Sequence, residues 1–176
     1  MRKYSELETE RLFLRPTAID DAEFFFELLN TPKWIQYIGE RHITDMESAK
    51  KYIQEKVLPK PDKVGVNFTV RLKENGAKIG SCGLYRREGL DYMDIGFAFL
   101  PGFEQQGYAY ESARRVLEMG FSDFGIDRVC AITTEDNFRS QRLLTKLGME
   151  YEKIIRIPND DVDLMLYNLD AADWNM

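Results

Sequence analysis

The segment from residue 92 to residue 134 constrains the fold more than any other part of the chain. Residues 92–100 and 128–134 are mostly apolar, with many β-branched and aromatic side chains, and predict two strands. Between them, residues 107–121 carry apolar side chains at helical spacing and predict an amphipathic helix. A strand, a helix and a second strand in this order form a crossover unit, which makes the two strands parallel.

The remaining elements extend this unit into a mixed sheet. Residues 66–72 and 78–87 are strand-like and flank Asn75-Gly76, a strong hairpin signal. Further strands are expected at 10–15, 150–157 and 162–169, and helices at 17–30, 45–57 and 137–147, with an irregular joint at 32–39. The prediction is a single α/β domain over residues 1–176, with a mixed sheet of about six to seven strands and helices on both faces.

Two short patterns predict where the first helices begin. Thr17-x-x-Asp20 and Thr44-x-x-Glu47 both resemble capping boxes, in which a hydroxyl and a carboxylate satisfy free backbone N–H groups. Thr17 and Thr44 are therefore expected to cap these helices.

Composition and charge exclude several classes of function. The net charge is −6 and the pI about 5.0, which disfavours nucleic-acid binding through phosphate neutralisation. No apolar run is long enough to span a bilayer, and the first residues lack the apolar core of a signal peptide, so a cytoplasmic protein without membrane contact is expected. One histidine, His42, and two cysteines inside strand-like runs, Cys82 and Cys130, disfavour a metal site.

The short loop before the helix at 107–121 is suited to bind an anion. Free N–H groups at a helix N-terminus attract phosphate, and Gly107 would allow a phosphate to approach the backbone. The loop lacks the Gly-Lys-Ser/Thr of a Walker motif and the first two glycines of a dinucleotide fingerprint. A glycine before a helix can also serve chain geometry alone, so the loop by itself indicates phosphate only weakly.

Two motifs together resemble the GNAT superfamily of N-acetyltransferases. Residues 104–109, Glu-Gln-Gln-Gly-Tyr-Ala, follow Phe-Leu-Pro and resemble motif A. Residues 137–149, from Asn-Phe-Arg-Ser to Leu-Gly-Met, resemble motif B. The opening at residues 8–16, Glu-Thr-Glu-Arg-Leu-Phe-Leu-Arg-Pro, and the order of elements are similar to the Rim-type branch, which includes ribosomal-protein N-terminal acetyltransferases.

The resemblance implies an acetyl-CoA-dependent enzyme. An acetyl group would pass from acetyl-CoA to a primary amine, of a peptide or protein N-terminus or of a small molecule, by direct attack in a ternary complex. Backbone N–H groups would hold the pyrophosphate at Glu104, Gln105, Gln106, Gly107, Tyr108 and Ala109. The pantetheine arm would pair with Phe97, Ala98 and Phe99 and contact Asn137 and Ser140, and an N–H of Phe99 or Ala98 would stabilise the oxyanion. No metal is implied, and a homodimer is possible.

The catalytic residues implied by the resemblance are Asp94 and Ser140. Asp94 lies where some GNAT enzymes have a catalytic glutamate and would accept the amine proton through water. Ser140 is the best remaining donor to the coenzyme sulfur, because Leu144 stands where many relatives have the tyrosine that protonates the thiolate. The alternative acids are Tyr85, Tyr92, Tyr108 and Tyr110, although most tyrosines are expected to serve packing. Asp94 could instead be a structural carboxylate, and Ser140 a helix-face serine bonded to the backbone. Glu104 also departs from the Gln or Arg of the motif.

The amine acceptor is expected to bind between the joint at residues 33–42 and the loop at 157–163, which carries Asp160, Asp161 and Asp163. Trp34, Tyr37 and Glu40 combine aromatic rings with a carboxylate, which suits a cationic amine, although a packed aromatic pair is an equal reading. Two other functions stay open at this stage. One is a non-catalytic acyl-CoA-binding or regulatory module on the same fold, and the other is an unrelated phosphate-binding α/β protein.

Overall fold

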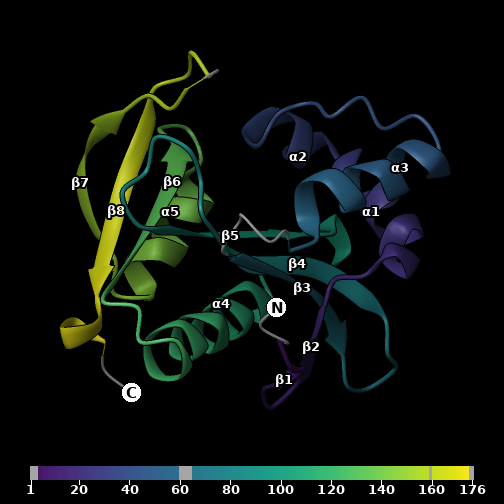
Figure 1. The fold of residues 1–176 in the computed structure, drawn as a ribbon, viewed down its shortest axis with the longest axis horizontal. Coiled ribbons are helices and arrows are strands. Elements are labelled where there is room, and N and C mark those ends of the chain that lie inside the picture. The colour runs from purple at the N-terminus through teal and green to yellow at the C-terminus, as the bar shows by residue number, and fades with distance from the viewer. Residues whose placement is uncertain (1–3, 60–64, 159, 175–176) are drawn as a thin grey trace.

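A computed structural model describes residues 4–59, 65–158 and 160–174. These residues form a mixed sheet of eight strands in the order β1-β2-β3-β4-β5-β6-β8-β7 (Figure 1). The strands are β1 (Leu7–Glu8), β2 (Leu12–Pro16), β3 (Gly65–Leu72), β4 (Lys78–Tyr85), β5 (Met93–Phe99), β6 (Arg128–Thr134), β7 (Glu150–Ile155) and β8 (Leu164–Asp170). The mixed sheet is confirmed. It has one strand more than the six to seven expected, because the two-residue strand β1 pairs with β2.

The strand directions follow the sequence prediction. β5 and β6 are parallel, as the crossover unit requires, and the other neighbouring strands are antiparallel. The hairpin between β3 and β4 turns through Asn75 and Gly76, where Gly76 has a φ of 74° that favours glycine.

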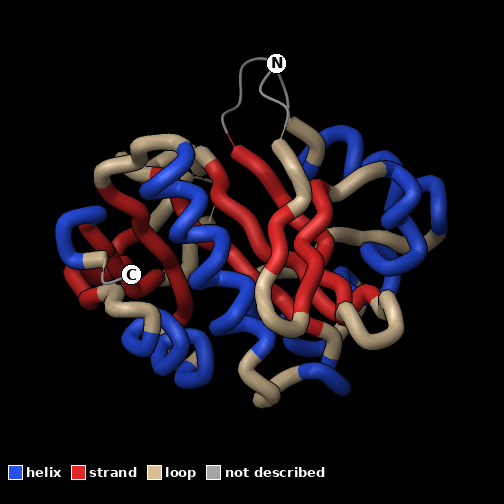
Figure 2. Tube along the Cα trace, turned by 90° about the horizontal axis from the view of Figure 1, so that it is seen from below, coloured by secondary structure: helices blue, strands red, loops and turns tan. Residues whose placement is uncertain are grey.

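Helices cover both faces of the sheet, as expected. The elements are η1 (Ile19–Asp21), α1 (Ala22–Leu29), α2 (Pro32–Tyr37), α3 (Met46–Tyr52), η2 (Ile53–Val57), η3 (Pro101–Phe103), α4 (Tyr108–Glu118), η4 (Met119–Asp123), α5 (Phe138–Lys146) and η5 (Ala171–Asp173). Buried side chains of α4 and α5 share one core cluster with the sheet. Those of α1 and α3 form a second cluster. Figure 2 views the molecule from below and shows helices on both sides of the strands.

Both capping predictions are wrong in detail. Thr17 turns inward and its hydroxyl bonds Thr69 at 2.9 Å, so the first helical turn instead uses the Asp21 carboxylate, which accepts from the Ala18 N–H at 3.0 Å. The next helix is capped one residue later than expected, by Asp45, which accepts from the Ser48 N–H at 2.8 Å. Thr17 does not cap the helix because its hydroxyl is buried against the sheet and must find a hydrogen-bond partner there.

The expected irregular joint is partly helical. Residues 32–37 form α2, with Pro32 in its first turn and the Thr31 side chain accepting from the Trp34 N–H. Proline is well suited to this position because its φ is already helical. Among the helices that the structure describes, none has the length and apolar character needed to cross a membrane.

Candidate active site

β5 and β6 separate after only two paired positions. The register between them contains Met93 with Val129 and Asp94 with Cys130. On its other side, β5 stays paired with β4 up to Phe99. Figure 1 shows β6 and β8 running at a steep angle to β4 and β5. Within the described residues, the edge of β5 from Ile95 to Phe99 therefore has no strand partner, although β5 lies in the middle of the sheet.

The direction of each backbone N–H group decides which amides of β5 face the opening between β5 and β6. The Leu100 N–H donates to the Ile79 carbonyl of β4 at 2.9 Å. Because N–H groups alternate between the two edges of a strand, the Ala98 amide also points toward β4, whereas the amides of Phe97 and Phe99 point toward the opening. Of the two oxyanion donors suggested by the sequence, Phe99 is the one with suitable direction.

The loop at residues 104–109 lies at the N-terminus of α4, as predicted. Gln105 and Gly107 have φ values of 60° and 85°, in the left-handed region. Such residues turn successive N–H groups into a concave, anion-binding surface. Gly107 is the N-cap and no side chain caps the helix there, so the first N–H groups of α4 are available to a ligand.

Cationic side chains that sequence analysis missed surround this loop. The guanidinium of Arg11 donates to the Gln106 carbonyl at 3.0 Å, pairs with Glu111 at 2.7 Å and stacks over the Tyr108 ring. Lys33 and Arg139 both pair with Glu104. No sequence pattern links these residues to the loop, because Arg11 and Lys33 come from elements far away along the chain.

Asp94 is a buried carboxylate at the closed end of the opening. Its side chain lies on the sheet face of α1 and α3, since Ala98, four residues on, packs there and side chains alternate along a strand. Oδ2 accepts from Arg87 at 2.8 Å, while Oδ1 has no hydrogen bond to any described residue. Burial raises the pKa of Asp94 to about 6, against the opposing influence of the Arg87 guanidinium and the Ile132 N–H.

A hydrogen-bonded network beside Asp94 was also missed. Tyr85 lies opposite Asp94 across the β4–β5 pair, and its hydroxyl donates to the Asn67 amide oxygen. The Tyr85 ring covers Gly83 and Gly96, because a Cβ at Gly96 would lie 2.9 Å from it. The Ser81 hydroxyl donates to the same Asn67 oxygen at 2.8 Å. Burial raises the pKa of Tyr85, so the hydroxyl stays protonated and can only donate to this oxygen.

The N-terminus of α5 carries the two predicted residues of the second motif. Asn137 caps this helix, its side-chain oxygen accepting from the Ser140 N–H at 3.2 Å. Ser140 is half-buried, and its hydroxyl has no hydrogen bond to the described residues. Leu144 is only 1% exposed and packs in the α4–α5 core, so no acidic hydroxyl occupies that position.

The three predicted acceptor residues are spread along α2 and beyond its end. Trp34 packs against the α1–α3 cluster, and its indole nitrogen is buried without a hydrogen bond to the described residues. Tyr37 is half-buried, while Glu40 is exposed and lies 3.6 Å from His42. In the described part of the chain, no hydrogen bond or ion pair joins Trp34, Tyr37 and Glu40 to one another.

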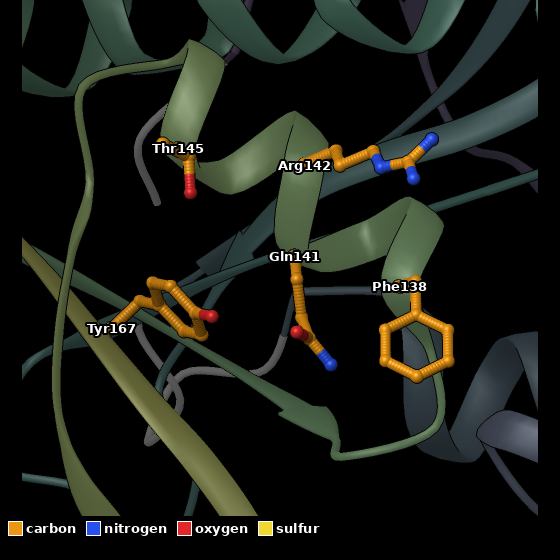
Figure 3. Close-up of a pocket in the computed structure, with 5 residues that line it drawn as sticks. All are labelled: Phe138, Gln141, Arg142, Thr145 and Tyr167. Carbon is orange, nitrogen blue, oxygen red and sulfur yellow. The ribbon is translucent and has the colours of Figure 1, made fainter.

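A separate hollow lies on the other flank of α5. It has a volume of about 370 Å³ and is lined by Phe138, Gln141, Arg142, Thr145 and Tyr167 (Figure 3). Ser140 and Leu144 lie on the opposite side of the helix. The hollow therefore contains none of the residues expected to bind the coenzyme.

The described residues contain no group of three or more His, Cys, Asp or Glu side chains that could hold a metal ion. Cys82 and Cys130 are both buried free thiols. Burial raises the pKa of each to about 12, so neither is a thiolate nucleophile at neutral pH.

Comparison with known proteins identifies the family. A family model described as an acetyltransferase (GNAT) domain matches residues 11–150. The chain is 30% identical over 151 residues to YoaA of Bacillus subtilis (strain 168), an uncharacterized N-acetyltransferase, with 85% of each chain covered. It is similar to a GNAT-family acetyltransferase structure from Bacillus anthracis, with a TM-score of 0.79, 25% identity and coverage of 96% and 99%.

More distant structures share the fold. The ribosomal-protein-S5-alanine acetyltransferase of Vibrio fischeri has a TM-score of 0.75 at 16% identity, covering 98% of this chain and all of its own. The spermidine N-acetyltransferase of Vibrio cholerae, solved with CoA and spermine, has a TM-score of 0.77 at 16% identity, with coverage of 94% and 99%. Rim-type proteins are thus among the structural neighbours, and the reading as an unrelated phosphate-binding protein is excluded. The chain belongs to the GNAT family and is an acetyltransferase.

Proposed function

We propose that this acetyltransferase transfers the acetyl group of acetyl-CoA to a primary amine by direct attack in a ternary complex. The open edge of β5, ending beside the loop at 104–109, carries the proposal. An amide-containing arm can pair with that edge as an added strand does, while a pyrophosphate meets the N–H groups of the loop. The amides of Phe97 and Phe99 face the arm, and Asn137 and Ser140 contact it from α5.

The coenzyme and the amine are proposed to approach from opposite faces of the sheet. α4 and α5 cover the face on which the coenzyme arrives, and Asp94 lies on the opposite face, from which the amine approaches. The neutral amine nitrogen attacks the thioester carbon, and the Phe99 N–H stabilises the oxyanion. The nitrogen loses its proton, through water, to Asp94. As the carbon–sulfur bond breaks, the Ser140 hydroxyl donates a proton to the sulfur and takes one back from water. The thiol and the amide leave, and Asp94 releases its proton to solvent.

Asp94 has the properties that a general base needs. Its free Oδ1 can accept a proton, and a pKa of about 6 leaves it ionised at neutral pH yet more basic than an ordinary aspartate. The Tyr85–Asn67 network is the adjoining wall of the acceptor space. Trp34, Tyr37 and Glu40 are proposed to line its outer part.

The acceptor is proposed to be a protein N-terminus or a small amine. Fold neighbours named for each class, an S5-alanine acetyltransferase and a spermidine N-acetyltransferase, support this range. The deciding test is release of free thiol from acetyl-CoA with a panel of amines and N-terminal peptides. Turnover with any amine supports the enzyme. Tight acetyl-CoA binding with transfer to no amine or peptide of the panel would contradict the proposed acceptor class.

A further inference from the structure

We propose that Glu104 is an internal substitute for a coenzyme phosphate, which holds Lys33 and Arg139 at the loop until acetyl-CoA binds and takes both cations from it. The inference rests on the proposed function, in which the loop at 104–109 binds the coenzyme phosphates. It goes further by assigning phosphate recognition to two side chains outside the loop and a competing role to Glu104.

The two cations that contact Glu104 come from separate parts of the fold. Lys33 reaches it from α2, and Arg139 from the first turn of α5, where Nη1 lies 3.1 Å from the carboxylate. Arg139 also contacts the side chain of Gln105, whose amide oxygen can accept from the guanidinium at 2.9 Å. One carboxylate therefore holds two cations at the loop that precedes α4.

The charges around the loop make this arrangement suited to exchange. Arg11, Lys33 and Arg139 supply three positive charges, and Glu111 and Glu104 offset two of them. The Arg11–Glu111 pair is reinforced by a bond to Thr9 at 2.6 Å and by the Arg11 backbone amide, so it stays intact. The side chains of Lys33 and Arg139 are 41% and 61% exposed, and such pairs are weak enough to be displaced by a multiply charged phosphate.

The transfer of Lys33 from Glu104 to the coenzyme phosphates connects coenzyme binding to the proposed amine-binding residues. α2 carries Lys33 and the proposed acceptor residues Trp34 and Tyr37. When the phosphates take Lys33 from Glu104, α2 is tied to the bound coenzyme rather than to the empty loop. Acetyl-CoA binding thus prepares the acceptor side, which favours coenzyme binding before the amine.

The test compares acetyl-CoA with S-acetylpantetheine, which has the thioester arm and no pyrophosphate. Affinity for acetyl-CoA is measured by calorimetry, and kcat/KM for both thioesters by thiol release. Glu104→Gln should tighten acetyl-CoA binding by roughly 3- to 10-fold at low salt, because the cations are no longer competed for. Arg139→Gln and Lys33→Met should each weaken it by roughly 3- to 10-fold. For S-acetylpantetheine, which has no phosphate for the cations to bind, the three variants should change kcat/KM much less than they change it for acetyl-CoA.

The Arg156–Asp163 pair provides matched controls. Its atoms lie 2.6 Å apart, both side chains are more than 60% exposed, and it joins the β7–β8 turn. Asp163→Asn removes one negative charge, as Glu104→Gln does, and Arg156→Gln removes one positive charge, as Arg139→Gln does. Both control variants should leave acetyl-CoA affinity unchanged. Unchanged or weaker acetyl-CoA binding by Glu104→Gln, or equal effects on both thioesters, would overturn the inference while leaving the proposed function intact. If the wild-type protein does not bind acetyl-CoA, both fail.

Discussion

Asp94 lies opposite Cys130 in the last position at which β5 pairs with β6. Beyond it the two strands part, so the carboxylate stands where the sheet opens. Opening a sheet at its centre exposes backbone groups that must find a partner, and a ligand with amide groups can satisfy them. The position of Asp94 thus places a buried carboxylate at the end of the edge that is proposed to bind the thioester arm.

Replacing Asp94 by Asn should lower kcat by roughly 10²- to 10⁴-fold, the usual contribution of a general base. Thiol release measures the loss, and calorimetry should find acetyl-CoA affinity unchanged. Asp91→Asn, an exposed carboxylate three residues away, is the control and should retain full activity. An active Asp94→Asn enzyme would assign Asp94 a structural role.

The same variant should be at least as stable as wild type at pH 8. The folded protein holds the Asp94 proton more tightly than the unfolded chain, with a pKa of about 6 against the usual 3.8. Its contribution to stability is therefore present below pH 4 and is lost as the pH rises through about 6. Thermal unfolding at pH 5 and pH 8 measures this, and a large loss of stability on replacement at pH 8 would contradict it.

The pH dependence of kcat/KM should follow the ionisation of Asp94. Activity is expected to rise through about pH 6, since only the carboxylate accepts a proton. Arg87→Gln should move this rise to higher pH, because the guanidinium favours the charged form. Arg86→Gln, which loses only a bond to the Asp91 carbonyl, should leave the profile in place. An unshifted profile in Arg87→Gln would exclude Asp94 as the titrating group.

Ser140→Ala should lower kcat by roughly tenfold or more with little change in acetyl-CoA affinity, if the hydroxyl donates to the leaving sulfur. The helix itself should be unaffected, since Asn137 caps it through the Ser140 backbone N–H. A thioester with a more acidic thiol needs less protonation, so such a substrate should restore part of the rate. Equal losses for both thioesters would argue against the donor role.

Gly107→Ala should destabilise the protein by about 1 kcal/mol and weaken acetyl-CoA binding. Its φ of 85° disfavours side chains, and a Cβ would lie 3.2 Å from the Arg11 guanidinium. Gly102→Ala is the matched control in the preceding turn, where a Cβ meets no atom within 4 Å. Thermal unfolding and calorimetry should separate the two variants, and similar results for both would remove the special role of Gly107.

Local patterns were sufficient for most of the fold. The helical spacing in residues 107–121 and the turn at Asn75-Gly76 each depend on neighbouring residues, and the crossover rule then makes β5 and β6 parallel. The predictions that failed concern two helix starts and the joint at 32–39, part of which is the helix α2. Thr17 satisfies the requirements of a cap by sequence, but the buried Thr69 and Asn67 side chains bind its hydroxyl instead.

The sequence by itself determined the order of elements, the GNAT motifs and the positions of Asp94, Gly107, Asn137 and Ser140, because each is defined within a short segment. Only the tertiary structure decided how far β5 and β6 stay paired, and which amide of β5 faces the opening. It also brought Arg11, Lys33 and Arg139 to one loop and Tyr85 to Asn67. These contacts join segments distant along the chain, and they follow from the packing of the sheet and its helices rather than from any local pattern.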